Sequence, residues 1–150
     1  CNIDDEEYLI TASSIKHQFE IWKDFKPDAL IIRTLPNHQN KQFLRFNESI
    51  PPFFTNDALK LIHKFKIKHL IVDVPSVDRM DDKGLLGNHR IFWGDGLNAN
   101  SEVNPDSRKT ITELAYIPNS AKDGLYFLNI QIPHFVCDAA PSRPLLYSVV

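Results

Sequence analysis

The chain has 150 residues, 43% of them hydrophobic and 24% charged, a composition typical of one globular domain with a sizeable core. Its 17 Lys and Arg against 19 Asp and Glu give a formal net charge of −2 without any block of like charge. The sequence therefore lacks the basic surface that binds nucleic acids or anionic membranes. Its longest apolar runs have the length of a strand, which is too short to span a bilayer.

The cysteines and the chain start indicate the compartment. Cys1 and Cys137 belong to no CxxC pair, so we expect reduced thiols, with a disulfide as the alternative. The chain opens at Cys1 with no charged and apolar leader. We therefore expect a cytoplasmic protein, and we interpret the chain as truncated at its N-terminus.

The first third of the chain predicts a strand, a helix and a second strand. Residues 8–11 have the composition of a short strand. A helix should follow, with Ser13 or Ser14 as its N-cap and with apolar side chains at helical spacing, namely Ile15, Phe19 and Trp22. The continuous apolar run over residues 29–33 is typical of a strand buried on both faces in a parallel sheet.

A long connection over residues 34–54, rich in phenylalanine, leads to the next helix and strand. A connection of this length is usually functional or packs on something, and we expect it to contact a partner subunit. Residues 55–57 predict the start of a helix whose apolar face is Ala58, Leu59, Ile62 and Phe65. Residues 69–73 then predict a buried strand, so the middle of the chain should form a right-handed parallel crossover.

The second half of the chain predicts mainly strands. Residues 95–109 form a polar loop without periodicity, and strands are expected over residues 110–116, 125–132 and 144–150. The fold class that follows is a mixed α/β sheet with flanking helices, strand-rich towards its C-terminal end.

Polar side chains crowd the end of the strand at residues 69–73. Asp73, Ser76 and Asp78 lie where open α/β sheets place their ligands, although Ser76 and Asp78 have the alternative role of holding the turn. Asp73 ends a buried run, so its carboxylate has to be paired or functional.

His89 and Glu113 are two further candidates. His89 follows the break at Gly87-Asn88, ahead of an apolar turn. Glu113 should share one strand face with Ile111 and Ala115, which is unusual for a carboxylate. The alternative is an edge strand with a solvated Glu113. The sequence contains no phosphate loop, GxSxG elbow or HExxH motif.

Five segments, in order, resemble the cyclase family of metal-dependent hydrolases, which includes bacterial kynurenine formamidase and isatin hydrolase. The resemblance extends from about Tyr8 to the end of the chain, and the segments are ALIIRT (29–34), HLIVDVPSVD (69–78), NHRIFWG (88–94), ITELAYIP (111–118) and DAAPSRPLLY (138–147). It implies a single domain over residues 1–150, with the swivelling β/β/α fold of that family. It also implies a hydrolase that uses zinc or manganese to direct water onto an amide bond of a small molecule, as arylformamidases do.

The resemblance assigns roles to individual residues. His89 and Glu113 correspond to metal ligands, His89 being also the catalytic residue, and Asp73, Ser76 and Asp78 would lie at the mouth of the substrate pocket. The metal-binding HxGTHxDxPxH segment of the family does not occur in this chain, so the remaining ligands are expected upstream of residue 1 and hydrolysis should be impaired. The alternative is a non-catalytic cyclase-like module for oligomerisation or binding. Either interpretation implies a homo-oligomer.

Overall fold

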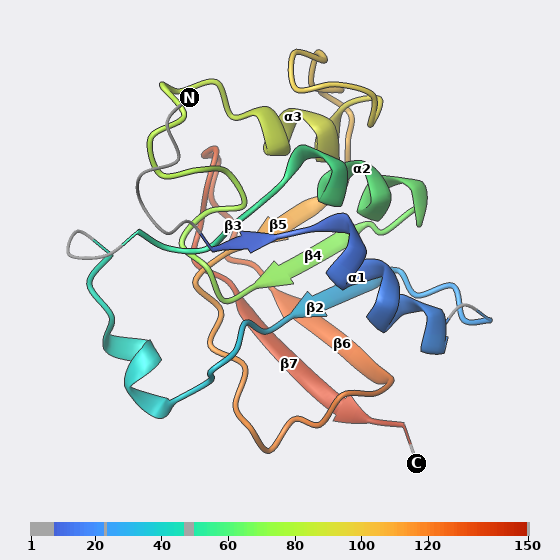
Figure 1. Ribbon diagram of the computed structural model, residues 1–150, viewed down its shortest axis with the longest axis vertical. Helices are drawn as coiled ribbons and strands as arrows, with labels where there is room; N and C mark the ends of the chain where they lie inside the picture. Colours follow the sequence, from blue (N-terminus) through green and yellow to red (C-terminus); the bar gives the residue numbers. More distant parts are fainter. Residues whose placement is uncertain (1–7, 23, 47–49, 150) are drawn as a thin grey trace. The chain divides into compact units, whose positions relative to one another are not determined.

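The computed structural model describes residues 8–22, 24–46 and 50–149, which contain helices and both parallel and antiparallel strands joined by long loops (Figure 1). The helices are α1 (Ala12–Phe19), α2 (Asn56–Lys64) and α3 (Gly87–Trp93), with short 3-10 helices at Glu20–Trp22 (η1) and Gln39–Phe43 (η2). The strands are β1 (Leu9–Ile10), β2 (Ala29–Ile32), β3 (Phe53–Phe54), β4 (His69–Val72), β5 (Thr110–Thr112), β6 (Tyr126–Gln131) and β7 (Arg143–Ser148). The predicted mixed α/β class is confirmed.

The chain divides into two compact units, one ending at Ile117 and one beginning at Pro118. In the first unit, β2, β4 and β5 form a parallel sheet with β4 in the middle, and β1 pairs with β3, also in parallel. The second unit contains the antiparallel pair of β6 and β7. None of the helices in the described part of the chain is long and apolar enough to cross a membrane.

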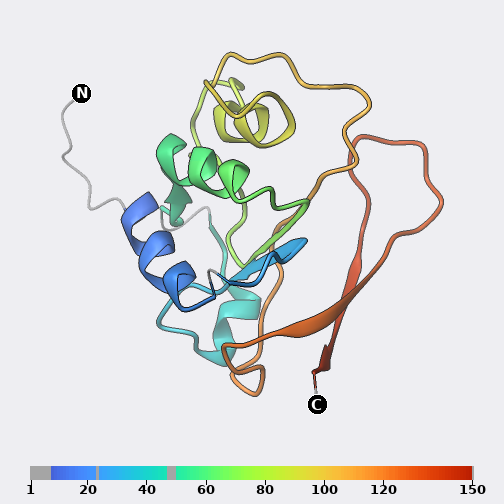
Figure 2. The same cartoon turned by 90° about the vertical axis from the view of Figure 1, so that its right-hand side faces the viewer.

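The core of the first unit forms where α2 packs on β4. Thr55 caps α2 by accepting a hydrogen bond from the Ala58 amide, and the predicted apolar face places Ala58, Leu59 and Ile62 fully out of contact with water. Leu70 and Val72 of β4 are equally buried. In Figure 2, α2 lies between α1 and α3, and it contacts both of them. Buried residues of β4, α2 and α3 thus belong to one hydrophobic core.

Several elements differ from the expectations. Thr11, and not Ser13 or Ser14, is the N-cap of α1, because its side chain accepts from the Ser14 amide. The connection over residues 34–54 contains η2 and β3, and Phe54 lies in the core at 1% exposure instead of facing a partner. The residues around His89 form α3, a helix that the glycine at its first position concealed.

The strand β5 is shorter than residues 110–116. It ends at Thr112 because Leu114 adopts a left-handed backbone conformation, with φ 54°, which a strand cannot contain. Glu113 is therefore not a member of an alternating strand face with Ile111 and Ala115. It follows the carboxyl end of β5 directly, beside the carboxyl end of the neighbouring strand β4.

Removing a core side chain of α2 should destabilise the first unit strongly. Leu59 is 0% exposed, so Leu59→Ala should lower the free energy of unfolding by about 2–5 kcal/mol through lost burial and a cavity. Urea unfolding followed by circular dichroism measures this difference. Ile21→Ala is the control, because Ile21 is 66% exposed and its truncation should change the free energy by less than about 0.5 kcal/mol. Equal losses for both variants would contradict the assignment of Leu59 to the core.

Candidate functional site

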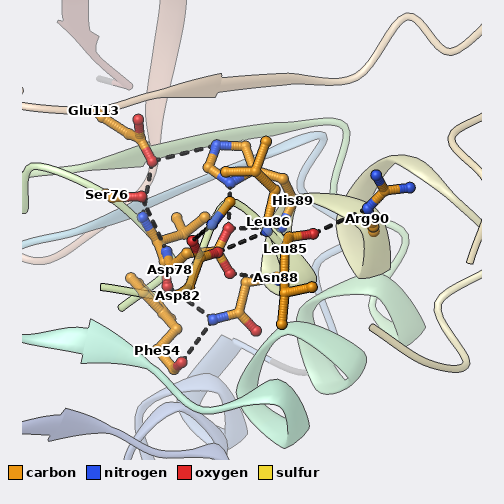
Figure 3. Close-up of polar contacts among 12 residues, drawn as sticks. Phe54, Ser76, Asp78, Asp82, Leu85, Leu86, Asn88, His89, Arg90 and Glu113 are labelled. Carbon is orange, nitrogen blue, oxygen red and sulfur yellow. Dashed lines mark hydrogen bonds and ion pairs between the residues drawn. The ribbon is translucent and has the colours of Figure 1, made fainter. Parts of the chain in front are cut away.

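Asp78, His89 and Glu113, here called the His89 cluster, meet beside the carboxyl end of the parallel sheet (Figure 3). His89 lies between the two carboxylates. Its Nδ1 is 2.6 Å from Asp78 Oδ2, and its Nε2 is 3.5 Å from Glu113 Oε1. The side chains of Asp78 and His89 are only 6% and 13% exposed, and that of Glu113 is 26% exposed. The cluster thus joins the turn after β4, the helix α3 and the end of β5.

Asp78 holds the first turn of α3 as well as the imidazole. Its Oδ1 accepts a hydrogen bond of 2.6 Å from the Asn88 amide, and its Oδ2 lies 3.5 Å from the His89 amide. The free amides of a helix N-terminus favour a negative charge at this place. The same carboxylate therefore fixes both the backbone that carries His89 and the orientation of the His89 ring.

Ser76 has the structural role that was the alternative for it. Its hydroxyl accepts a hydrogen bond of 3.1 Å from the Asp78 amide and so shapes the turn that presents Asp78. Asp78 has a turn role too, but its contact with the His89 ring goes beyond that role.

Asn88 is a residue whose importance the sequence did not reveal. It is 3% exposed, and its Nδ2 donates to the Phe54 and Val77 carbonyls at 2.7 and 2.8 Å. These bonds tie α3 to β3 and to the turn after β4. The sequence indicated only a Gly-Asn break, because no local pattern shows that the amide would be buried.

Glu113 is held in place by a backbone amide. Its Oε1 accepts a hydrogen bond of 2.8 Å from Val77, the residue before Asp78. The same oxygen is the one that faces His89 Nε2. β5 is an edge strand of the described sheet, as the alternative expected, but the Glu113 side chain is largely buried and hydrogen-bonded. The turn after β4 therefore positions both carboxylates of the His89 cluster.

The pKa of His89 is raised by its surroundings. Burial by itself lowers the pKa, but the hydrogen bond to Asp78 and the negative charges of Glu113, Asp78 and Asp82 outweigh it, so the pKa lies above the ordinary value of 6.5. The protonated imidazole can donate to both neighbouring carboxylates. Its contribution to stability is complete below pH 6.5 and is lost as the pH rises through the folded-state pKa.

Asp73, the third residue expected at the pocket, makes its contacts elsewhere. The Thr34 amide donates to both carboxylate oxygens of Asp73, at 3.1 Å to Oδ1 and 2.9 Å to Oδ2. Lys41 Nζ forms an ion pair with Asp73 Oδ2 at 2.7 Å. The side chains are 1% exposed for Asp73 and 14% for Lys41. Asp73 is therefore paired, as a buried carboxylate must be, and it ties η2 to the ends of β2 and β4. No pattern in the sequence pointed to Lys41.

The donor atoms of the His89 cluster fit zinc or manganese in kind but not in number. His89 Nε2 and Glu113 Oε1 are an imidazole nitrogen and a carboxylate oxygen facing each other, which both metals accept. Within residues 8–22, 24–46 and 50–149, however, no group of three or more His, Cys, Asp or Glu side chains is arranged to hold a metal ion. The described residues alone do not complete a catalytic metal site, which usually has three protein ligands.

Cavities give no separate support for a substrate pocket at Asp73, Ser76 and Asp78. One hollow of about 390 Å³ is lined by residues 131–133 and 141–143. A second hollow of about 180 Å³ is lined by residues of α1, by the segment that follows α1, and by Phe65 at the end of α2. Neither of these two hollows is lined by a residue of the His89 cluster.

Breaking the buried ion pair should be costly because it leaves Asp73 charged and without its cation. Lys41→Met should lower the free energy of unfolding by about 3–5 kcal/mol, measured by urea unfolding. Lys60→Met is the matched control, since Lys60 and Asp57 form an exposed ion pair, and it should cost less than about 1 kcal/mol. Adding Asp73→Asn to Lys41→Met should recover part of the loss. A cost for Lys41→Met no larger than that of Lys60→Met would contradict the buried-pair interpretation.

Neutralising Glu113 should lower the pKa of His89. Glu113→Gln removes a charge that raises this pKa while keeping an oxygen that can accept from the Val77 amide. Titration of the His89 ring protons by NMR measures the change, with His63, whose pKa burial and Lys109 lower, as the internal reference. The stability difference between the wild type and the variant should be largest below pH 6.5 and shrink as the pH rises. An unchanged pKa of His89 would show that Glu113 does not act on the ring.

Comparisons with protein families, with curated proteins and with solved structures found no match to this chain. The function therefore has to be inferred from the residues of the His89 cluster and from their contacts.

Proposed function

We propose that the chain carries part of the active site of a metal-dependent amide hydrolase of the cyclase type, with the swivelling β/β/α fold of that family. The observation that carries the proposal is the pairing of His89 and Glu113. The sequence resemblance assigns these two residues as metal ligands, and they lie on different elements, yet His89 Nε2 and Glu113 Oε1 face each other at 3.5 Å. The resemblance makes no use of this distance, so the distance supports it independently.

The surroundings of His89 support the same role. Asp78 accepts from Nδ1, which leaves the lone pair of Nε2 in the neutral ring directed towards Glu113. Metal-binding histidines commonly donate their other ring nitrogen to a carboxylate in this way. A bound zinc or manganese ion would lower the pKa of a water ligand and polarise an amide carbonyl. Asp78 orients the ring, and Glu113 supplies the facing oxygen.

Protons and a metal ion compete for the same atom of His89. The raised pKa keeps Nε2 protonated to a higher pH than in an ordinary histidine, and a metal ion binds only the unprotonated nitrogen. Affinity for zinc should therefore increase as the pH rises through the pKa of His89. Without a metal, the protonated ring can act only as a proton donor.

The proposal requires at least one ligand beyond the described residues. In the family that the sequence resembles, the HxGTHxDxPxH segment supplies most of the ligands. With His89 and Glu113 alone, we expect weak metal binding and impaired hydrolysis of a small amide such as an aryl formamide. The substrate, the homo-oligomeric state and the choice between zinc and manganese are part of the same proposal.

A second candidate is a non-catalytic oligomerisation or binding module. It is favoured by the lack of a three-ligand group among the described residues, since a protonated His89 between two carboxylates can also act as a purely structural link. Self-association would use the segment around η2, where Leu35 and Phe43 are 80% and 81% exposed.

Metal titration separates the two candidates. Calorimetry of the chain with Zn²⁺ and with Mn²⁺ at pH 8 should show binding that His89→Ala and Glu113→Ala weaken at least about tenfold. His17→Ala is the matched control, because His17 lies exposed on α1 and should not affect binding. Hydrolysis of N-formylkynurenine with saturating metal is the parallel assay. If the wild type binds neither metal, or if His89→Ala binds metal as tightly as the wild type, the hydrolase proposal is overturned. The non-catalytic module then remains as the proposed function.

A further inference from the structure

Two leucines beside the His89 cluster have unusual backbone conformations. Leu86 has φ 50° and immediately precedes α3, and Leu114 has φ 54° and immediately follows Glu113. Glycine and asparagine adopt this left-handed region readily, whereas a leucine there is strained. Neither leucine is a core residue, since they are 46% and 63% exposed. Burial of their side chains therefore does not account for the strain, and strained backbone of this kind gathers at functional sites.

The turn at Leu86 directs α3 towards Asp78. The Leu86 amide donates a hydrogen bond of 2.6 Å to Asp82 Oδ2, which holds the chain just before the helix. Two residues later the Asn88 amide donates to Asp78 Oδ1, and the His89 ring meets Asp78 Oδ2 at 2.6 Å. Figure 3 shows Leu86 beside this group of contacts.

The turn at Leu114 directs Glu113 towards His89. The Leu114 and Ala115 amides donate to the Val74 and Val72 carbonyls at 2.9 and 3.0 Å, so the chain stays attached to the segment of β4 after the strand β5 has ended. With the turn fixed in this way, Glu113 Oε1 reaches the Val77 amide at 2.8 Å and faces His89 Nε2. A continued strand would have placed Glu113 on the alternating pattern of β5 instead.

We propose that Leu86 and Leu114 are positioning residues whose left-handed backbones set the separation between His89 Nε2 and Glu113 Oε1. Leu86 acts through α3 and Asp78, and Leu114 acts through the orientation of Glu113. The consequence for metal binding rests on the proposed function, whereas the consequence for the geometry of the cluster does not.

Three substitutions separate the backbone conformation from the side chain. Leu114→Val keeps an apolar side chain but resists a positive φ, because β-branched residues are genuine outliers there. Leu114→Gly removes the side chain and permits the positive φ. Lys66→Val is the matched control, since Lys66 has φ 61° at the end of α2, where its amide donates to the His63 carbonyl. The pair Leu86→Val and Leu86→Gly repeats the design at the other turn.

Amide hydrogen exchange followed by NMR measures the result. The Val77 amide reports the bond to Glu113, the Asn88 amide reports the bond to Asp78, and the Ile71 amide of β4 reports the stability of the sheet. Leu114→Val should accelerate exchange at Val77 about tenfold relative to Ile71, and Leu86→Val should do the same at Asn88. The glycine variants should leave both ratios within about twofold of the wild type. Lys66→Val should change neither ratio.

Three outcomes of the exchange experiment would contradict the positioning role of Leu86 and Leu114. If Leu114→Val and Leu86→Val leave the ratios unchanged, or if they accelerate all three amides equally, the two turns do not position the cluster and the proposal falls. Greater loss in the glycine variants than in the valine variants would assign the effect to the side chains and overturn it as well. Zinc titration of the same variants then tests the proposed function separately. If the valine variants alter the exchange ratios but neither the wild type nor any variant binds zinc, the positioning role of Leu86 and Leu114 stands and the hydrolase proposal is refuted.

Discussion

The carboxylate of Asp78 is the interaction on which the candidate site depends. It is buried, it accepts from the first turn of α3, and it accepts from the ring of His89. A negative charge in this place has to be matched on every side, and the helix amides and the imidazole do so together. The position of α3, the orientation of His89 and the protonation of the ring consequently all depend on this side chain.

The turn after β4 connects Asp78 to the neighbouring strand and to α3 through its own backbone groups. Within a few residues it presents the Val77 amide to Glu113, the Val77 carbonyl to Asn88, and the carboxylate of Asp78 to His89. Parallel strands end at the same edge, so a single turn at that edge can contact the end of β5 and the start of α3 at once. The buried side chains of β4 and α2 belong to one hydrophobic core, which supports this edge.

Periodic elements were predictable from the sequence, whereas contacts between distant segments were not. The apolar face of α2 followed from its helical spacing, and the strands β2 and β4 followed from continuous apolar runs, because burial selects apolar residues along each element. Asp73 was expected to be paired or functional, but its partner Lys41 lies in η2, a short 3-10 helix that no sequence pattern predicted. The end of β5 was missed because a left-handed Leu114 leaves no mark in the sequence, where glycine would have left one.

The ion pair between Lys41 and Asp73 also determines how the connection around η2 can move. The ammonium group reaches into the sheet edge and binds the Thr34 carbonyl and hydroxyl as well as Asp73. An outward swing of η2 leaves a nearly inaccessible carboxylate without its counterion, with only the Thr34 amide and hydroxyl still donating to it. The segment around η2 should therefore open rarely, although its regular structure is limited to a short 3-10 helix and a two-residue strand.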